Sequence, residues 1–402
     1  MKKTTGKDRS ITSKWRPQTR AVRAGTWRSE QGETSEAIFL TSGYAYDDAE
    51  TAAARFRGED PGMTYSRLQN PTVAMLEERI AAMEGAEACR VQSSGMAAMT
   101  VALLCQLGQG DHMVAGRAAF GSCRWIVDNL FPRFGIESTT IDARDNQAWV
   151  DAIRPNTRVF FFETPANPTM DIVDIQFECG LARERGIVSV VDNAFATPAL
   201  QRPLEFGADV VAYSATKLMD GQGRVLAGAV CGSEDFITNK LLAMQRHTGP
   251  NLSPFNAWVV LKGLETLSLR ARQQSENALK VGRFLEGRVP RINFPALPSH
   301  PQHNLAMQQM DAAGPIFSFE VEGGRAQAFA LLNALELIDI SNNIGDARSL
   351  MCHNASTTHY SVSQDVRDEM GVTEGMLRIN VGLEEPDDVI DDLDQALRQA
   401  GL

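Results

Sequence analysis

The apolar residues of this 402-residue chain follow two kinds of pattern between about residues 72 and 232. Segments 73–83 and 97–107 carry apolar residues every three or four positions, which indicates amphipathic helices. Between such segments lie short continuous apolar runs, which indicate strands buried on both faces. These runs are residues 112–115, 159–162, 187–191, 210–213 and 227–231. The alternation predicts an α/β fold with a mostly parallel central sheet covered by helices on both sides.

The chain on either side of this region follows other patterns. Residues 1–64 contain few long periodic segments, and we expect them to form an N-terminal arm that reaches over a neighbouring subunit. Residues 65–254 form the expected larger domain. We expect residues 255–402 to form a smaller α+β C-terminal domain. Its expected elements are a long helix at 255–285, strands at 316–321 and 376–381, a helix at 326–335 and a final helix from Pro386.

Composition excludes several classes of protein. The chain is 43% hydrophobic and 22% charged, which is ordinary for a globular protein, and its net charge is -11. Because phosphate neutralisation needs clustered Lys and Arg, we predict no nucleic-acid partner; the basic cluster at residues 2–23 is interpreted as a solvated tail. The start lacks the apolar stretch of a secretory signal, and no apolar run is long enough to cross a bilayer, so we predict a soluble cytoplasmic protein without a membrane partner.

Cysteine and histidine spacing predicts neither disulfides nor a metal site. Six cysteines are widely spread without a C-x-x-C pair, which favours buried free thiols in a reducing compartment. Packing is the expected role of Cys123. The histidines at 300, 303, 353 and 359 lack carboxylate or cysteine ligands at familiar spacings, so we interpret them as loop residues and predict no metal.

The polar residues that follow two of the apolar runs suggest a cofactor. Asp192 ends the run at 187–191, and Ser214, Thr216 and Lys217 follow the run at 210–213. Pyridoxal phosphate needs a lysine for its aldehyde, a carboxylate for its pyridinium nitrogen and hydroxyls near its phosphate. Ser214 and Lys217 also match the Ser-x-x-Lys motif of serine acyl-enzymes. That motif opens a helix and needs a Lys-Thr-Gly triplet, which this chain lacks.

Several motifs in a fixed order resemble those of the pyridoxal-phosphate enzymes of cysteine and methionine metabolism, which include cystathionine synthases and lyases. They are Tyr65-Ser-Arg67, Ser94-Gly-Met96, the segment 163–168, Val191-Asp-Asn193 and Ser214-Ala-Thr-Lys217. The segments 120–123, 217–224 and 341–346 are similar to the O-succinylhomoserine sulfhydrylase branch of that family. The resemblance extends from about Thr19 to Leu397.

This resemblance implies an aspartate-aminotransferase-like fold (fold type I), pyridoxal 5'-phosphate bound in the 65–254 domain, and a homotetramer built as a dimer of dimers. The implied reaction is a γ-replacement in methionine biosynthesis: sulfide and O-succinyl-L-homoserine give L-homocysteine and succinate. The alternative is a cystathionine γ-synthase or a γ-lyase acting on a related homoserine-derived amino acid. A non-catalytic binding protein on the same fold is a further alternative, but it would have no reason to keep Lys217, Asp192 and Arg378 together.

The resemblance also implies roles for individual residues. Lys217 would bind the cofactor covalently and carry most proton transfers, with Tyr65 assisting, and Asp192 would keep the ring nitrogen protonated. The remaining cofactor-binding residues are Gly95 and Met96 through their backbone N–H groups, Ser214 and Thr216 near the phosphate, Asn167 on the phenolic oxygen, Phe120 stacked on the ring, and Tyr65 with Arg67 on the phosphate of a neighbouring subunit. For Gly95 and Met96 a plain helix N-cap is the alternative, and for Asn167 a local turn.

Arg378 interrupts the apolar pattern 376–381, and a charge inside a strand is rarely tolerated unless it is paired. A substrate α-carboxylate would pair with its guanidinium, and Asn343 lies where much of the family has a serine that helps this contact. A salt bridge between domains is the alternative. Arg224 would bind a distal succinyl carboxylate or lie on the surface. Asn354 replaces a proline of relatives, in a loop near the substrate end of the family's pocket.

Overall fold

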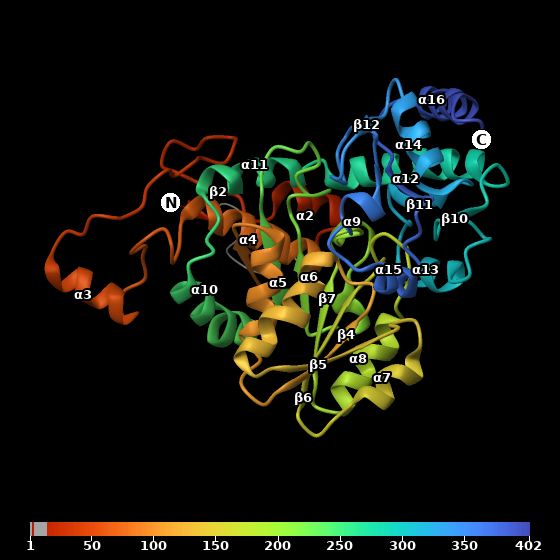
Figure 1. Cartoon of the computed structure of the whole chain (residues 1–402). Helices are drawn as coiled ribbons and strands as arrows, with labels where there is room; N and C mark the ends of the chain where they lie inside the picture. Colours follow the sequence, from red (N-terminus) through yellow and green to blue (C-terminus); the bar gives the residue numbers. More distant parts are fainter. Residues whose placement is uncertain (1, 4–13) are drawn as a thin grey trace.

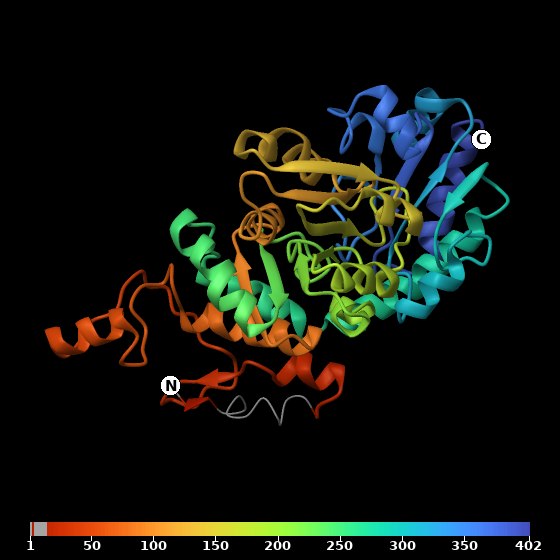
Figure 2. The same ribbon diagram turned by 90° about the horizontal axis from the view of Figure 1, so that it is seen from below.

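The protein is described by a computed structural model that covers residues 2–3 and 14–402 (Figures 1 and 2). Its larger sheet has the strand order β3-β9-β8-β7-β6-β4-β5, in which only β9 runs against its neighbours. The predicted mostly parallel sheet is therefore confirmed. Its strands are β3 (Ala88–Gln92), β4 (His112–Gly116), β5 (Glu137–Ile141), β6 (Thr157–Glu163), β7 (Val188–Asp192), β8 (Val210–Tyr213) and β9 (Gly228–Gly232).

Alternate residues of these strands enter two separate cores. In β6, Val159 and Phe161 pack on the side of α5, whereas Phe160 and Phe162 face the opposite side, where the ring of Trp149 lies 4.8 Å from that of Phe160. Continuous apolar runs are explained by this two-sided burial. The helices of this region are α4 (Pro71–Glu84), α5 (Gly95–Leu104), α6 (Gly121–Trp125), α7 (Asn146–Ala152), α8 (Ile175–Glu184), α9 (Thr197–Leu200), α10 (Leu242–Thr248) and α11 (Pro254–Leu264).

Two strands of this sheet were not predicted. β5 lies at an edge of the sheet and has the sequence Glu-Ser-Thr-Thr-Ile, so it lacks an apolar run. β3 lies at the other edge, and Arg90 interrupts its apolar positions. The residues of β5 are exposed or only partly buried, so this strand needs few apolar side chains, whereas β3 is buried except at Arg90, whose charge is paired with Glu77 at 3.1 Å. The predicted helix at 97–107 is also shorter than expected, since α5 ends at Leu104.

The single long helix expected at 255–285 was wrong. The structure has two helices there, α11 and α12 (Leu267–Leu285), separated at Glu265 and Thr266. Arg270 of α12 stabilises the break, because its guanidinium donates to the backbone oxygen of Gly263 in the last turn of α11, at 2.9 Å. The same guanidinium donates to the backbone oxygens of Leu218 and Met219, at 2.8 and 3.3 Å. One buried arginine thus links both helices to the segment that follows Lys217.

A second sheet forms the α+β unit that was expected near the C-terminus (Figure 1). Its strand order is β10-β11-β14-β13-β12, mostly antiparallel. Helix α16 packs on both α12 and α14 beside this sheet. Besides α12, its elements are β10 (Arg291–Asn293), α13 (His303–Gln309), β11 (Ile316–Glu320), α14 (Gly324–Ala334), β12 (Asp339–Ile340), β13 (Leu350–His353), α15 (Gln364–Met370), β14 (Met376–Asn380) and α16 (Pro386–Gln399).

The first 64 residues include short elements: β1 (Lys2–Lys3), α2 (Pro17–Arg23), β2 (Trp27–Arg28) and α3 (Ala49–Arg57). Helix α2 packs on α4, where Arg20 donates to the backbone oxygen of Ala82 at 3.3 Å. Helix α3 projects away from the rest of the chain in both views (Figures 1 and 2). The boundaries at residues 64 and 254 stay predictions. Residues 4–13 of the basic tail expected at residues 2–23 lie outside the described residues, but its last seven residues form helix α2, so this part is packed against the protein and is not a solvated tail. None of the helices in the described part of the chain is long and apolar enough to span a membrane.

Candidate active site

A cavity of about 280 Å³ lies at the carboxyl ends of the parallel strands, next to the second sheet. Ligands of open α/β sheets bind at this edge. The cavity brings together nine of the predicted site residues from segments far apart in the chain, so most of the candidate set forms one site. They are Gly95, Met96, Phe120, Asn167, Asp192, Ser214, Thr216, Lys217 and Arg378.

The start of helix α5 forms one wall of the cavity. Ser94 caps this helix, and its hydroxyl accepts the N–H of Ala97 at 3.1 Å. The N–H groups of Gly95 and Met96 belong to the first turn, where the helix supplies no acceptor. Gly95 allows a close approach to β8, because a Cβ at this position would lie 2.6 Å from the Ser214 side chain. The helix start and the strand end are thereby held together, and free N–H groups there can bind an anion.

Lys217 follows strand β8 in a turn, and does not open a helix as the serine acyl-enzyme motif requires. Its Nζ donates to Oδ1 of Asn343 at 2.9 Å. Burial and the nearby Arg378 guanidinium lower the pKa of Lys217 to about 8. A lysine with this pKa is partly neutral near pH 7–8 and can act as a nucleophile or a base.

Two carboxyl groups lie side by side at the ends of neighbouring strands, since Glu163 of β6 and Asp192 of β7 are register partners. Burial raises the pKa of Asp192 to about 7. Burial and the adjacent Asp192 raise the pKa of Glu163 well above its usual range. Asp192 accepts the N–H of Ala194 at 3.0 Å, and Glu163 accepts the N–H of Phe120 at 2.8 Å. The pair therefore favours a cation bound beside Asp192.

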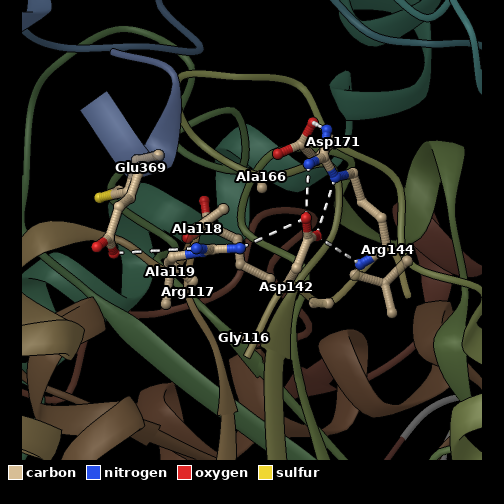
Figure 3. A pocket seen from close by; sticks show the side chains of 13 residues that line it. Gly116, Arg117, Ala118, Ala119, Asp142, Arg144, Ala166, Asp171 and Glu369 are labelled. Atoms are coloured by element: carbon tan, nitrogen blue, oxygen red, sulfur yellow. Dashed lines mark hydrogen bonds and ion pairs between the residues drawn. The ribbon is translucent and has the colours of Figure 1, made fainter. Parts of the chain in front are cut away.

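Glu163 is a cavity residue that the sequence analysis missed. The available signal was its position, because Glu163 ends the apolar run of β6 as Asp192 ends that of β7. Glu163 also borders a second, much smaller cavity. Four ion pairs line that cavity: Arg117 contacts Asp142 and Glu369, and Arg144 contacts Asp142 and Asp171 (Figure 3). Every charge in this network has a partner, and the contact to Glu369 ties helix α15 to the segment after β4.

Arg378 lies in strand β14 and is 3% exposed. Its two terminal nitrogens donate to Oδ1 of Asn167 at 2.9 Å and to the backbone oxygen of Asn342 at 2.8 Å. Its Nε has no hydrogen-bond partner among the described residues. Within the described ranges, no carboxylate lies within 4.0 Å of this guanidinium, so the alternative of a salt bridge between domains is not found. A buried cation without a counter-ion can bind an anionic ligand.

Some predicted residues lie outside the cavity or have other partners. Tyr65 and Arg67 are absent from its lining; Tyr65 is 43% exposed, and the Arg67 guanidinium lies 5.6 Å from its ring and donates to the backbone oxygen of Arg246. Asn343 contacts Lys217 rather than Arg378. The Thr216 hydroxyl already accepts the backbone N–H of Ala227 at 2.9 Å and donates to the backbone oxygen of Ala227 at 3.2 Å.

Arg224 and the cysteines have structural partners. Arg224 pairs with buried Asp220 at 3.0 Å and does not line the cavity, so a role for it in binding a distal carboxylate finds no support. All six cysteines are free, as expected, although Cys105 is only partly buried. Cys123 borders the cavity, but burial raises the pKa of its thiol well above the usual range. Among the described residues no cluster of His, Cys, Asp and Glu could hold a metal ion.

The fold and this site define a pyridoxal-phosphate enzyme: the chain belongs to the family described as Cys/Met metabolism PLP-dependent enzymes, whose family model matches residues 18–398. It is 45% identical over 382 residues to an O-succinylhomoserine sulfhydrylase of Mycobacterium tuberculosis, covering 94% of each chain. It is 40% identical to an L-methionine γ-lyase of Porphyromonas gingivalis, covering 94% of this chain and 96% of that one.

Solved structures give the same assignment. A putative O-acetylhomoserine (thiol)-lyase of Campylobacter jejuni superposes with a TM-score of 0.92 at 32% identity, covering 96% of this chain and all of the other; it carries a pyridoxyl-lysine phosphate. A cystathionine γ-synthase of Xanthomonas oryzae superposes with a TM-score of 0.91 at 33% identity, covering 96% and 99% of the two chains. The predicted family, the aspartate-aminotransferase-like fold and the cofactor pyridoxal phosphate are thus confirmed.

The residues around the cavity fit this cofactor. Lys217 supplies an amine of lowered pKa, and Asp192 is a buried carboxyl that a pyridinium cation would ionise. The first turn of α5 supplies N–H groups for a phosphate. Phe120 borders the same cavity and can stack on a ring. The amine, the carboxyl, the N–H groups and the aromatic ring are therefore all present around one cavity.

Proposed function

We propose that this protein catalyses γ-replacement on O-succinyl-L-homoserine, with sulfide as the nucleophile and L-homocysteine and succinate as products. One observation carries the amino-acid part of this proposal: Arg378 is a buried guanidinium in the cavity of Lys217 and has no carboxylate partner among the described residues. An α-carboxylate would supply that partner. The choice of the succinyl substrate rests on the relatives at 44–45% identity that are named O-succinylhomoserine sulfhydrylases.

Each residue of the cavity has a role in this proposal. Arg378 holds and orients the substrate carboxylate, Asn167 binds the phenolic oxygen of the cofactor while its Oδ1 accepts from Arg378, and Asp192 holds a proton on the ring nitrogen of the cofactor. Pyridoxal phosphate, when bound, supplies an electron sink for carbanions formed at the substrate. Lys217 moves protons at Cα and Cβ, because its pKa of about 8 lets it both accept and donate near neutral pH. Phe120 has no hydroxyl and cannot share this work.

The quaternary structure belongs to the same proposal. Tyr65 and Arg67 lie outside the cavity of their own chain, so we assign them to the phosphate site of a neighbouring subunit in a homotetramer built as a dimer of dimers. Asn343, which accepts a hydrogen bond from Lys217, would orient the amine and the substrate carboxylate together. The location proposed for the enzyme is the cytoplasm.

A γ-lyase is the second candidate, because several relatives at 37–40% identity are named L-methionine γ-lyases. The sulfhydrylase converts the four-carbon chain of the substrate to homocysteine, whereas the γ-lyase converts it to 2-oxobutyrate. The test is to assay purified protein with O-succinyl-L-homoserine, O-acetyl-L-homoserine and L-methionine, each with and without sulfide, and to quantify homocysteine and 2-oxobutyrate. Cysteine in place of sulfide tests for cystathionine.

Homocysteine formed mainly from the succinyl ester and sulfide would support the proposal. 2-Oxobutyrate as the main product in the presence of saturating sulfide would assign the protein to the lyases instead. Lys217→Ala is the matched inactive control, since it removes the amine and leaves the walls of the cavity in place. Any product formed equally by this variant comes from contaminating enzymes.

A further inference from the structure

The loop after strand β13 brings a threonine to the cavity that no motif indicated. Thr358 is one of the lining residues. Its backbone oxygen would lie 3.3 Å from a Cβ at Gly121, so this loop packs directly on the start of helix α6, beside Phe120. Arg378 comes from strand β14 instead. The two residues therefore reach the cavity from different segments.

Two fully buried side chains contact the Thr358 hydroxyl. Nδ2 of Asn354 donates to Oγ1 of Thr358 at 3.0 Å, and Nδ1 of His359 lies 2.8 Å from the same oxygen. Asn354 and His359 are both 0% exposed. Neither can turn to solvent, so the direction of each hydrogen bond is set by the surrounding protein.

The proton of the His359 ring is best placed on Nδ1. Burial, together with Arg378 and Arg367, lowers the pKa of His359 to about 4, so the ring is neutral and carries one N–H at physiological pH. Its Nε2 is buried, and no group in the described part of the chain forms a hydrogen bond with it. A proton there would leave a buried donor unpaired, which is costlier than an unpaired lone pair. With the proton on Nδ1, His359 donates to Thr358.

In this arrangement the hydroxyl proton of Thr358 is not used in the hydrogen bonds to Asn354 and His359. A hydroxyl has one donor and two acceptor lone pairs. Asn354 and His359 fill both lone pairs, and neither can accept the Thr358 proton. No oxygen of the described residues accepts it either, although Thr358 belongs to a cavity wall. A donor without a protein acceptor remains available to a ligand.

We propose that Thr358 donates a hydrogen bond to an acyl oxygen of the substrate, and that Asn354 and His359 are positioning residues that direct its proton there. This inference rests on the proposed function, because only an O-acyl substrate carries that oxygen. Arg378 keeps donors for the α-carboxylate, so Thr358 adds a second point of recognition. When the Cγ–O bond breaks, its electron pair stays on the acyl oxygen, and a donor at this oxygen binds the developing carboxylate more tightly.

The first test compares Thr358→Val with Thr358→Ser in the holoenzyme. Valine has nearly the shape of threonine but no hydroxyl, and we expect kcat/KM for O-succinyl-L-homoserine with sulfide to fall about 10- to 100-fold, as for loss of a hydrogen bond to a charged group. Serine should restore activity to within about threefold of wild type. Thr357→Val is the matched control: the Thr357 hydroxyl donates to the backbone oxygen of His353 at 2.7 Å and does not line the cavity.

The second test uses a ligand without an acyl oxygen. L-Norleucine binding, followed by the change in cofactor absorption, should differ less than about twofold between wild type and Thr358→Val, because only an acyl oxygen loses its donor. Asn354→Asp replaces the donor by an acceptor that captures the Thr358 proton, so it should lose activity toward the acyl substrate although the hydroxyl is still present. Thermal unfolding of each variant separates these effects from loss of the fold.

The outcomes separate this inference from the proposed function. If Thr358→Val keeps kcat/KM for the acyl substrate within about twofold of wild type, or weakens norleucine binding as much as acyl-substrate binding, the acyl contact is wrong. If wild type turns over no O-acylhomoserine, the proposed function fails. The affinity of the holoenzyme for O-succinyl-L-homoserine then still decides the role of Thr358: a loss confined to this ligand supports the contact, and no loss overturns it.

Discussion

Replacing Arg378 by lysine tests the proposed carboxylate contact most directly. A guanidinium has five N–H donors, and the structure shows one bond from each terminal nitrogen, to Asn167 and Asn342. Three donors remain, enough for a bidentate pair with a carboxylate. A lysine ammonium keeps the charge but presents it at one point and cannot form the planar pair.

The expected loss follows from one missing charge-assisted hydrogen bond, which costs about 1.5–3 kcal/mol. At about 1.4 kcal/mol per factor of ten, KM for the amino-acid substrate should rise about 10- to 100-fold. We also expect kcat to fall, because the carboxylate contact orients the Cα–H bond. Cofactor absorption should stay unchanged, since Asp192 and Lys217 remain in place.

The assay is steady-state kinetics beside thermal unfolding of the holoenzyme. Arg224→Lys is the matched control, because Arg224 pairs with Asp220 outside the cavity, and its KM should stay within about twofold of wild type. Unchanged kinetics for Arg378→Lys, or a kinetic loss accounted for entirely by unfolded protein, would refute the assignment.

Three further predictions follow from the same site. Asp192→Asn should keep the cofactor bound but lower kcat by about two powers of ten or more, since one well-placed electrostatic partner is lost. Near-normal turnover would show that Asp192 has only a structural role in the turn after its strand. Mixing inactive Arg67→Ala with inactive Lys217→Ala should restore activity through hybrid dimers, and a lack of recovery despite measured subunit exchange would place each site within one chain. In the cofactor-free protein, Lys217→Met should raise the free energy of unfolding at pH 7. The folded-state pKa of Lys217 is lowered from 10.5 to about 8, so its burial penalty is complete below pH 8 and disappears as the pH rises to 10.5. The advantage of methionine should therefore shrink by about 3 kcal/mol over that window in urea titrations; a pH-independent advantage would contradict the lowered pKa.

The strand-end residues were predictable from the sequence because strands buried on both faces have continuous apolar runs. Asp192 and Lys217 each follow a continuous apolar run, and parallel strands bring such ends to one edge of the sheet. Glu163 has the same position after β6 but was missed, because no partner for a second carboxylate was evident. Arg378 stood out for the opposite reason, as a charge inside an apolar pattern.

Contacts between distant segments were beyond the sequence. The bond from Lys217 to Asn343 joins residues 126 positions apart, and that from Arg378 to Asn167 spans 211 positions. No local pattern records such pairings. The hydrogen bonds around Thr358 were missed although Asn354 was noticed, because the direction of a hydroxyl proton depends on burial and on the neighbouring ring. Arg270 was missed because it looks like an ordinary solvated residue of a long helix.

Arg270 has a consequence for how Lys217 moves. Its guanidinium holds the backbone oxygens of Leu218 and Met219, and Gly345 lies so close that a Cβ there would be 2.3 Å from the backbone nitrogen of Leu218. The backbone just after Lys217 is thus fixed from two directions. Movement of the Lys217 amine between Cα and Cβ of the substrate must then come from rotation about bonds of the four-carbon side chain alone. The side chain of Lys217 can therefore rotate while the backbone that follows it stays in place, and backbone amide hydrogens beside it should exchange slowly with solvent.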